Sequence, residues 1–487
     1  MATANLASVT VSIAALARGI GSLILLVNRQ VVSTESGNTS EAAGTKSTSS
    51  KVRPSTANFS FSVGKGNDEE AMWNDTSGAF IRCALFVYRR PQVRSEMADF
   101  HQQGPITTLH RLTEGANTQA LSFVSQPSVG SGVALVLPCL ISELEGSALP
   151  EIIRQVSSLR WLGRVIIGVD GANADSFKAA QALFASLPQQ TTVIWNDSEK
   201  MVSFDQNIGL SAGTGKGRNL WRCFGAAASY QDIHTIVVHD ADISTYESSF
   251  VARLAHPIVD DQMGFDFVKG FYPRFDHQGL NGRVTRLLVG PLLDSLASSH
   301  PSHPGIRYLQ SFRYPLAGEF AARASLTSSI TIPEHWGVDI SLLAKVHSLG
   351  VRVAQTDLTD RYDHKHQILS PDDPESGLHR MARDIISTLV SISGRENIEG
   401  PDFDARLDHA LLSHRSNAIS NAIPINSDAE NSAAKLFAEL VRETQTPLPP
   451  NLPSWKQLST EFPNCIQELM SAVESQSISD GATDTSP

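Results

Sequence analysis

Cysteine is scarce in this chain, and its scarcity excludes two classes of protein. The 487 residues contain four cysteines, Cys83, Cys139, Cys223 and Cys465. No two of them form a CxxC pair, the spacing typical of zinc and redox sites. We therefore expect a protein of a reducing compartment, without a disulfide framework and without a zinc site.

Positive charge is also in short supply. Lysine and arginine number 39 against 50 aspartate and glutamate residues, which gives a formal net charge of -11 and a pI of about 5.7. Nucleic acids and anionic membranes attract proteins through a basic field. Neither is therefore expected as the main partner, although local basic sites could still bind small anions.

The N-terminal segment lacks both a long apolar run and acidic residues. Arg18 and Gly19 interrupt its apolar stretch before it reaches the roughly 18 residues that a membrane helix needs. Residues 1–34 contain no Asp or Glu, a composition typical of an organelle transit peptide. The Ser- and Thr-rich segment 35–70 is typical of disorder.

We interpret residues 1–96 as an N-terminal extension, largely disordered and with the composition of a transit peptide. The location would then be an organelle stroma or matrix, and otherwise the cytoplasm. An extension without function, such as one from a misplaced start codon, is the alternative.

From Val133 onward, short apolar runs alternate with helical stretches. VALVLPCL (133–140), RVIIGVD (164–170), TTVIW (191–195) and TIVVHDAD (235–242) are the predicted strands. This alternation predicts an α/β protein with a mostly parallel sheet and flanking helices. Ligands of such sheets bind beyond the carboxyl ends of the strands, so the loops that follow these strands are the candidate site.

Two carboxylates one residue apart, Asp240 and Asp242, follow the last of these strands. Alternation along an extended segment can place both on one side, where they could hold a divalent cation. They could equally be ordinary loop acids or a helix cap. A third alternative is a DxD phosphatase of the haloacid-dehalogenase type with Asp240 as nucleophile, although three βα units precede the motif here.

The glycine-rich stretch GTGKGRNLW (213–221) opens a predicted helix. It is not a nucleotide P-loop, because Leu210 and Gly217 occupy positions that need Gly and Ser or Thr. Lys216 on such a turn is well placed for a phosphate or a ribose, and a plain helix-entry turn is the alternative.

Basic residues gather in the next predicted elements. Lys269 and Arg274 lie on the strand DFVKGFYPRF (266–275), and the helix within LNGRVTRLLVGPLL (280–293) begins near Gly282, Arg283 and Thr285. A helix amino terminus with a guanidinium and a hydroxyl suits a phosphate or carboxylate. His364, in YDHKHQ, could join Asp242 as a metal ligand or be structural.

Taken together, these stretches resemble the glucosyl-3-phosphoglycerate synthase family of retaining glycosyltransferases. The resemblance covers residues 97–395, beginning at MADFHQQGPITTLH. Its further motifs follow one another in the family's order: VLPCLISELEG, GKGRNLW, DAD, VKGFY, GRVTRLLVGPLL, PLAGEFAAR, WGVDISLL and YDHKHQ. It implies a GT-A fold for residues 97–395. Beyond Arg395 the sequence itself turns helical and polar, which predicts a helical region over residues 396–487 that ends in a disordered acidic tail.

The resemblance also implies a role for each matching position. Asp339 and Asp242 would be catalytic, and Asp242 with His364 would hold Mg²⁺ or Mn²⁺. Donor binding would fall to Pro138, Leu140, Glu143, Glu145, Asp170, Lys216 and Asp240. Acceptor binding would fall to Gly282, Arg283, Thr285 and His366, with Lys269 adding positive charge. Two positions depart from the family pattern: Asp339 stands where the family has Glu, and His366 where it has Asn.

The implied reaction is transfer of glucose from a nucleotide sugar, UDP-glucose first, to 3-phosphoglycerate. The product would be a compatible-solute precursor. Transfer of mannose from GDP-mannose, the DxD phosphatase and a non-catalytic sugar-nucleotide-binding relative remain as alternatives. A homodimer is an open assignment.

Overall fold

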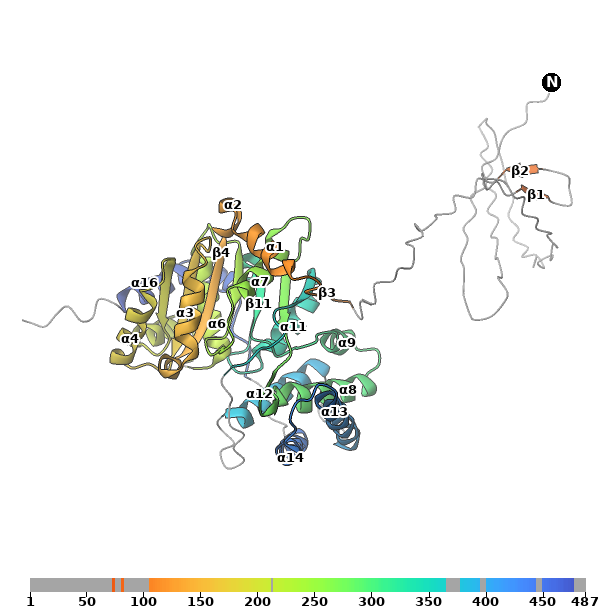
Figure 1. The fold of residues 1–487 in the computed structure, drawn as a ribbon. Helices are drawn as coiled ribbons and strands as arrows, with labels where there is room; N and C mark the ends of the chain where they lie inside the picture. Colours follow the sequence, from red (N-terminus) through yellow and green to blue (C-terminus); the bar gives the residue numbers. More distant parts are fainter. Residues whose placement is uncertain are drawn as a thin grey trace, which may run out of the picture. The chain divides into compact units, whose positions relative to one another are not determined.

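The computed structural model describes residues 72–74, 80–82, 105–211, 213–364, 377–394, 400–443 and 449–476 (Figure 1). The chain divides into two compact units, Met1–Glu96 and Met97–Pro487. In the first unit, β1 (Met72–Asn74) pairs antiparallel with β2 (Phe80–Arg82). The transit-peptide and disorder predictions for residues 1–70, and the acidic tail from residue 477, lie outside the described residues.

An eight-stranded sheet forms the centre of the second unit, in the order β3-β12-β8-β11-β7-β4-β5-β6. Neighbours run parallel except at β11, which is antiparallel to both β7 and β8. The strands are β3 (Thr107–Leu109), β4 (Val133–Leu140), β5 (Arg164–Asp170), β6 (Gln190–Trp195), β7 (Thr235–Val238), β8 (Phe267–Phe271), β11 (Phe320–Arg323) and β12 (Val353–Asp357). The mostly parallel sheet with flanking helices confirms the predicted fold class, which is that of a GT-A domain.

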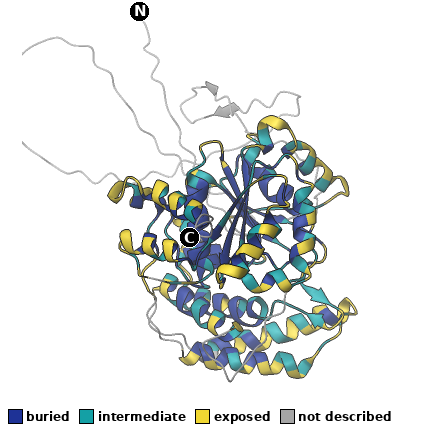
Figure 2. Ribbon diagram, turned by 90° about the vertical axis from the view of Figure 1, so that its left-hand side faces the viewer, coloured by how far each residue is buried: buried dark blue, intermediate teal, exposed yellow. Residues whose placement is uncertain are grey.

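Both faces of the sheet are buried, because successive side chains of each central strand enter different cores. In β4, Ala134 and Val136 belong to one core, while Leu135 and Leu137 belong to the other. Figure 2 shows these strands as the buried centre, with exposed residues on the outer surfaces of the helices. The continuous apolar strands in the sequence reflect this two-sided burial.

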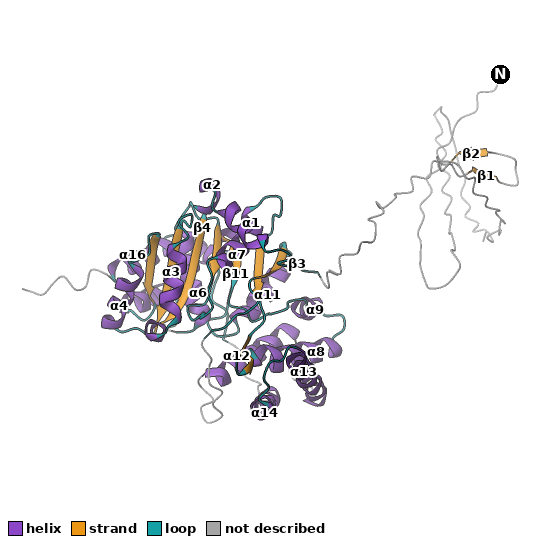
Figure 3. Ribbon diagram, viewed as in Figure 1, coloured by secondary structure: helices purple, strands orange, loops and turns teal. Residues whose placement is uncertain are grey.

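Helices cover each face (Figure 3). The core on one side is completed by α1 (Gly115–Val124), α3 (Ala148–Ser157), α4 (Ala174–Phe184) and α7 (Ser249–Val259). The core on the other side is completed by α5 (Glu199–Asn207), α6 (Lys216–Ala228), α8 (Gly290–Ser299), α9 (Pro304–Gln310), α10 (Ala324–Thr327) and α11 (Val338–Ser348). Two short elements, α2 (Pro127–Gly130) and the 3₁₀ helix η1 (Ile141–Glu145), lie at the two ends of β4.

The C-terminal helices add to the second core rather than forming one of their own. They are α12 (Gly377–Ser393), α13 (Gly400–Ser420), α14 (Ser427–Glu443), α15 (Trp455–Glu461) and α16 (Cys465–Ser475). Figure 1 shows α12, α13 and α14 grouped with α8. Farther along, Trp455 stacks on Trp221 of α6 at 4.3 Å between ring centroids. The predicted division at residue 395 stays a prediction.

The predicted helix after Gly282 differs in kind. Its first turns, η2 (Val284–Val289), form a π-helix, and α8 follows directly. Leu287, Leu288 and Leu292 are buried as predicted. The predicted strand 266–275 also ends early, at Phe271, and a hairpin of β9 (Phe275–Asp276) and β10 (Gly279–Leu280) follows it.

None of the helices in the described part of the chain is long and apolar enough to cross a membrane.

Candidate active site

Asp242 and His364 lie side by side at the end of β7. His364 Nδ1 is 3.4 Å from Asp242 Oδ2, and the other oxygen of Asp242, Oδ1, is buried without a hydrogen-bond partner among the described residues. A buried carboxylate oxygen without a partner is costly unless something else binds it, so this pair fits a divalent cation. No group of three or more His, Cys, Asp or Glu side chains that could hold a metal occurs among the described residues. Two protein ligands are enough for Mg²⁺, which usually keeps several waters.

Backbone contacts bring these two distant positions together. Ile243 and His364 form an isolated antiparallel bridge, and the Ser244 amide donates to the carbonyl of Asp363 at 2.9 Å. The Asp363 amide in turn donates to Thr245 Oγ1 at 3.0 Å. The loop after β7 therefore forms a short ladder with residues 363 and 364, which holds His364 against Asp242.

Lys216 links the other predicted acids of the site. Its Nζ lies 3.0 Å from Asp240 Oδ1 and 3.4 Å from Asp339 Oδ2, and the second oxygen of Asp339 lies 3.4 Å from Lys269 Nζ. Burial opposes the charged form of Lys216, but Asp240 and Asp339 outweigh it and raise the pKa of Lys216 above its ordinary value. The result is a row of alternating charges, with two ammonium groups and two carboxylates.

The pKa values of Asp240 and Lys269 in this row are also set by opposing effects. Burial raises the pKa of Asp240, but the ammonium of Lys216 outweighs it, so the carboxyl stays below its usual value. Burial lowers the pKa of Lys269 and Asp339 offsets this only in part. Lys269 is completely buried, so it contributes charge to Asp339 rather than a surface for ligands.

A short helix entry places Lys216 at this position. Gly215 precedes it with a φ of +143°, which favours glycine, and a Cβ there would meet the carbonyl of Glu334 at 2.4 Å. The side chain of Arg218 binds Glu334 at 2.7 Å and the fully buried Asp205 at 2.6 Å. The helix start is therefore locked between two carboxylates from other elements.

The predicted donor residues line the ends of β4 and β5. Asp170 accepts hydrogen bonds from Asn196 at 2.8 Å and Asn219 at 2.9 Å, and burial, the larger effect, raises its pKa to about 6. Burial and then the charges of Glu143, Asp170 and Asp242 raise the pKa of Cys139 to about 12.

The other predicted donor residues differ in exposure. Glu143 is buried and Glu145 is exposed, although both lie in η1. Pro138 is half-buried within β4, and Leu140 at its end is exposed. Partly exposed apolar side chains and a buried acid therefore follow one another along this part of the chain.

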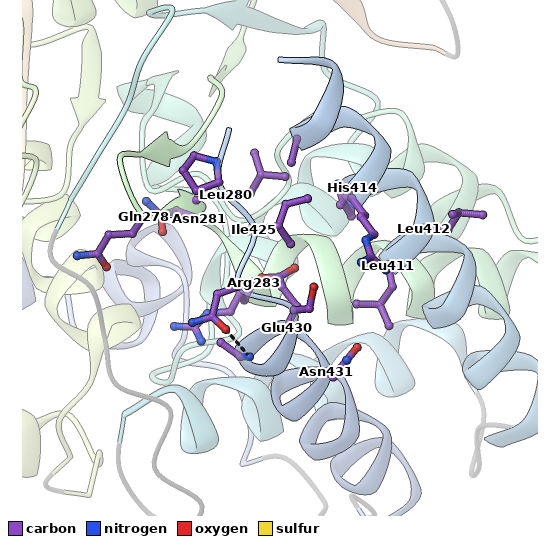
Figure 4. A pocket seen from close by; sticks show the side chains of 17 residues that line it. Gln278, Leu280, Asn281, Arg283, Leu411, Leu412, His414, Ile425, Glu430 and Asn431 are labelled. Carbon is purple, nitrogen blue, oxygen red and sulfur yellow. Dashed lines mark hydrogen bonds between the residues drawn. The ribbon is translucent and has the colours of Figure 1, made fainter. Parts of the chain in front are cut away.

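The predicted acceptor residues fall into several environments. Gly282 has a φ of +71°, and a Cβ there would meet the hydroxyl of Tyr314 at 2.7 Å. Thr285 lines a cleft of about 930 Å³ together with Arg274 and Tyr314. Arg283 instead lines a second pocket of about 420 Å³, between the β9–β10 hairpin and helices α13 and α14 (Figure 4).

The predicted acceptor set is therefore not one cluster. Lys269 lines neither of the two pockets and pairs with Asp339. His366 lies outside the described residues. Arg274 does fit an anion, because the hydroxyl of Tyr314, at 3.3 Å, is the one hydrogen-bond partner of its guanidinium among the described residues, and its buried Nε has none there.

Glu319 is the acid that the sequence interpretation missed. It is completely buried just before β11 and accepts hydrogen bonds from the hydroxyls of Tyr272 and Tyr362, at 2.5 and 2.6 Å. Its neighbour Gly318 touches the site, since a Cβ there would meet the Asp240 carboxylate at 2.2 Å. The only local signal was a charged residue inside the apolar run LAGEFAA.

Comparisons with known proteins identify relatives of one kind, although no family model matches the chain. The glucosyl-3-phosphoglycerate synthase of Persephonella marina is 31% identical over 408 residues, which cover 79% of this chain and 100% of the relative. The synthase of the same name from Methanococcoides burtonii is 31% identical over 398 residues, 77% of this chain and 97% of the relative.

Solved structures of another relative also match. The glucosyl-3-phosphoglycerate synthase of Mycobacterium tuberculosis, in complex with Mn²⁺, UDP-glucose and phosphoglyceric acid, is 25% identical. The match covers 60% of this chain and 89% of that chain with a TM-score of 0.44.

Proposed function

The chain belongs to the glucosyl-3-phosphoglycerate synthase family and is a glycosyltransferase, and from this premise we propose that it transfers glucose from UDP-glucose to 3-phosphoglycerate with the help of Mg²⁺ or Mn²⁺. The observation that carries the proposal is the pair Asp242–His364, with its unpartnered carboxylate oxygen, beside the charge row of Lys216. A transferase that breaks a glycosyl–phosphate bond needs positive charge at this place.

Asp242 and His364 would hold the cation at the end of β7. When bound, the metal supplies a Lewis acid that stabilises the negative charge developing on the leaving diphosphate. Lys216 keeps the pKa of Asp240 below its usual value, and this carboxylate would accept a hydrogen bond from the donor's ribose or from a metal-bound water. In this assignment Asp242 and His364 bind the metal, and Asp240 binds the donor or a metal-bound water.

The donor's nucleoside would lie on the rim formed by the ends of β4 and β5. Asp170 and Glu143 present carboxylates there, and Pro138 and Leu140 present apolar surface on which a base can pack. Glu145 is exposed at the end of η1, which follows β4, and would face the ribose hydroxyls of the nucleoside. A mixed apolar and acidic surface suits a neutral, hydroxyl-rich nucleoside.

Asp339 is the proposed contact to the transferred sugar. Its two oxygens are each 3.4 Å from a lysine ammonium, which fixes the orientation of the carboxylate. In a retaining transfer the acceptor attacks the face that the diphosphate leaves, and the leaving phosphate takes the acceptor's proton. Asp339 would hold the sugar hydroxyls while this exchange occurs.

The acceptor would enter beside the start of η2. Arg274 and Thr285 line one cleft, and the left-handed backbone at Gly282 sits against Tyr314 at its edge. A half-buried guanidinium without an acidic partner among the described residues, together with a hydroxyl, suits the phosphate and carboxylate of 3-phosphoglycerate. Arg283 and the positive charge of Lys269 would support this site from neighbouring positions.

The assignment is tested with a matrix of donors and acceptors. UDP-, ADP- and GDP-glucose and GDP-mannose are each offered with 3-phosphoglycerate or glycerate, with Mg²⁺ or a chelator, and products are identified by mass. We expect glucosyl-3-phosphoglycerate from UDP-glucose and loss of transfer with the chelator.

The control variant is Asp242→Asn, which should lose transfer and Mn²⁺ binding while its thermal unfolding stays close to that of the wild type. Mannose transfer from GDP-mannose in preference to any glucose donor would replace the assigned donor. Phosphate release without a sugar nucleotide, abolished by Asp240→Asn alone, would support the phosphatase alternative.

A further inference from the structure

Glu319 is a buried acid whose contacts lead to both halves of the proposed site. Its carboxylate has no exposure to solvent, and each oxygen accepts one phenol hydrogen bond, Oε2 from Tyr272 and Oε1 from Tyr362. The two tyrosine rings stack on each other at 3.6 Å between centroids and 4° between planes. The carboxylate therefore sets the position of both phenols at once.

The contact through Tyr362 leads to the proposed metal ligands. Tyr362 precedes His364 by two residues, and its ring lies edge-on to the imidazole at 5.9 Å between centroids. His364 in turn is 3.4 Å from Asp242. Because Tyr362 is completely buried, a shift of its ring must move the backbone that carries His364.

The contact through Tyr272 leads to the proposed acceptor cleft. Tyr272 lines this cleft and packs on Tyr314 at 5.0 Å between ring centroids. The hydroxyl of Tyr314 receives a hydrogen bond from Arg274 and lies where a side chain on Gly282 would be. The chain of contacts from Glu319 therefore ends at the guanidinium proposed for the acceptor's anionic group.

We propose that Glu319 is a positioning residue that holds the acceptor cleft in register with the metal ligands, through Tyr272 on one side and Tyr362 on the other. This inference rests on the proposed function. The acceptor cleft and the metal ligands must be fixed relative to each other, because the acceptor attacks the same face of the sugar that the diphosphate leaves. Small displacements of reacting groups lower the rate of such transfers strongly. Gly318, packed against Asp240, ties the same segment to the donor side.

The chemistry of the carboxylate makes the arrangement testable. Each oxygen of Glu319 accepts one phenol hydrogen bond, whereas an amide presents one acceptor and one donor group. In Glu319→Gln the amide oxygen can accept from only one phenol at a time, so neither Tyr272 nor Tyr362 keeps its hydrogen bond permanently. Tyr272→Phe and Tyr362→Phe each remove one of the two hydrogen bonds to Glu319 and leave the aromatic ring in place.

The test uses binding measurements on the full-length protein. Calorimetry gives the affinity for Mn²⁺ in the presence of UDP and, separately, for 3-phosphoglycerate. We expect Tyr362→Phe to weaken Mn²⁺ binding about fivefold and to change 3-phosphoglycerate binding less than about twofold. Tyr272→Phe should do the reverse, and Glu319→Gln should weaken both.

The matched control is Tyr308→Phe. Tyr308 is also buried, its hydroxyl has no hydrogen-bond partner in the described part of the chain, and it stacks on His347. Its replacement should change neither affinity. A purely structural role for Glu319 predicts lower melting temperatures for the three site variants with both affinities unchanged or weakened to the same extent, and that result would overturn the proposal.

The outcome also separates this inference from the proposed function. A wild-type enzyme that binds Mn²⁺ but makes no glucosyl-3-phosphoglycerate contradicts the function, and inorganic phosphate then replaces 3-phosphoglycerate as the probe of the Arg274 cleft. A wild-type enzyme that transfers glucose while Tyr272→Phe and Tyr362→Phe behave alike contradicts only the positioning role.

Discussion

At the scale of single residues, the site shows which side chains a sequence can reveal. Asp242 and His364 lie in compact polar motifs that follow apolar runs, and the structure places them together as predicted. Glu319 escaped notice because its partners, Tyr272 and Tyr362, are 47 and 43 residues away. No local pattern marks an acid whose role depends on two distant phenols.

The pKa of Asp170 gives a prediction about pH. Burial raises it to about 6, whereas in the unfolded chain an aspartate titrates near 3.8. Between these values the folded state binds more protons, so this residue lowers the free energy of unfolding as pH rises from about 4 to 6. We expect Asp170→Asn to remove this loss.

Denaturant titrations at pH 4.5 and pH 7 measure the effect. The free energy of unfolding of Asp170→Asn relative to the wild type should rise between the two pH values by about 2 kcal/mol. Asp175→Asn, which alters an acid of the first turn of α4, is the control and should show no such change. An identical pH dependence for Asp170→Asn and wild type would contradict the assignment.

Lys216 carries a second prediction at this scale. Lys216→Met keeps the length of the side chain but leaves Asp240 and Asp339 without the ammonium between them. Removing one such charge from a transferase site costs about a hundredfold or more in kcat. Steady-state kinetics test this, with the exposed Lys456→Met as control; loss of less than tenfold would remove Lys216 from the site.

At the scale of elements, the apolar runs predicted the parallel strands because burial on both faces leaves a continuous signal. The same runs carry no information on direction, so the antiparallel β11 between β7 and β8 could not be predicted from LAGEFAAR. The sequence pattern also could not distinguish the π-helix η2 from an α-helix, because its leucines keep nearly the same buried face in either helix type.

The glycine before Glu319 provides a prediction for this level. Gly318→Ala would put a Cβ 2.2 Å from a carboxylate oxygen of Asp240, so either the strand start or Asp240 must move. We expect loss of donor binding and of at least about 90% of kcat, by analogy with small displacements at other transferring sites. UDP calorimetry and kinetics measure both.

Gly115→Ala is the matched control, because a Cβ there meets only Thr113 Oγ1, at 3.8 Å. It should leave UDP binding and turnover unchanged. Normal UDP binding by Gly318→Ala would show that the contact with Asp240 can relax without consequence.

At the scale of the whole molecule, the second unit has two cores that share one sheet. The larger of these includes Phe403, Phe437 and Trp455 from the C-terminal helices. Their polar outer surfaces made the region beyond residue 395 look separable in the sequence. Amphipathic helices show that one face is buried, but not against which partner.

Two truncations test the division of the chain. A protein of residues 97–487 retains the whole second unit and should transfer glucose at the wild-type rate. A protein of residues 97–395 loses the three core side chains above and exposes Trp221, so we expect it to aggregate or unfold. Circular dichroism and the transfer assay distinguish the two; a folded, active 97–395 protein would establish an independent catalytic domain.

The stacking of Trp455 on Trp221 has a consequence for the timing of biosynthesis. Lys216 is the first residue of α6, and that helix packs against α15 and α16, which follow it in the sequence. During synthesis, α6 is complete more than two hundred residues before the first residue of α15 is added. A polypeptide growing on the ribosome therefore contains Lys216 long before the two helices that cover α6, and we expect α6 to gain its full packing only after α15 and α16 have been synthesised.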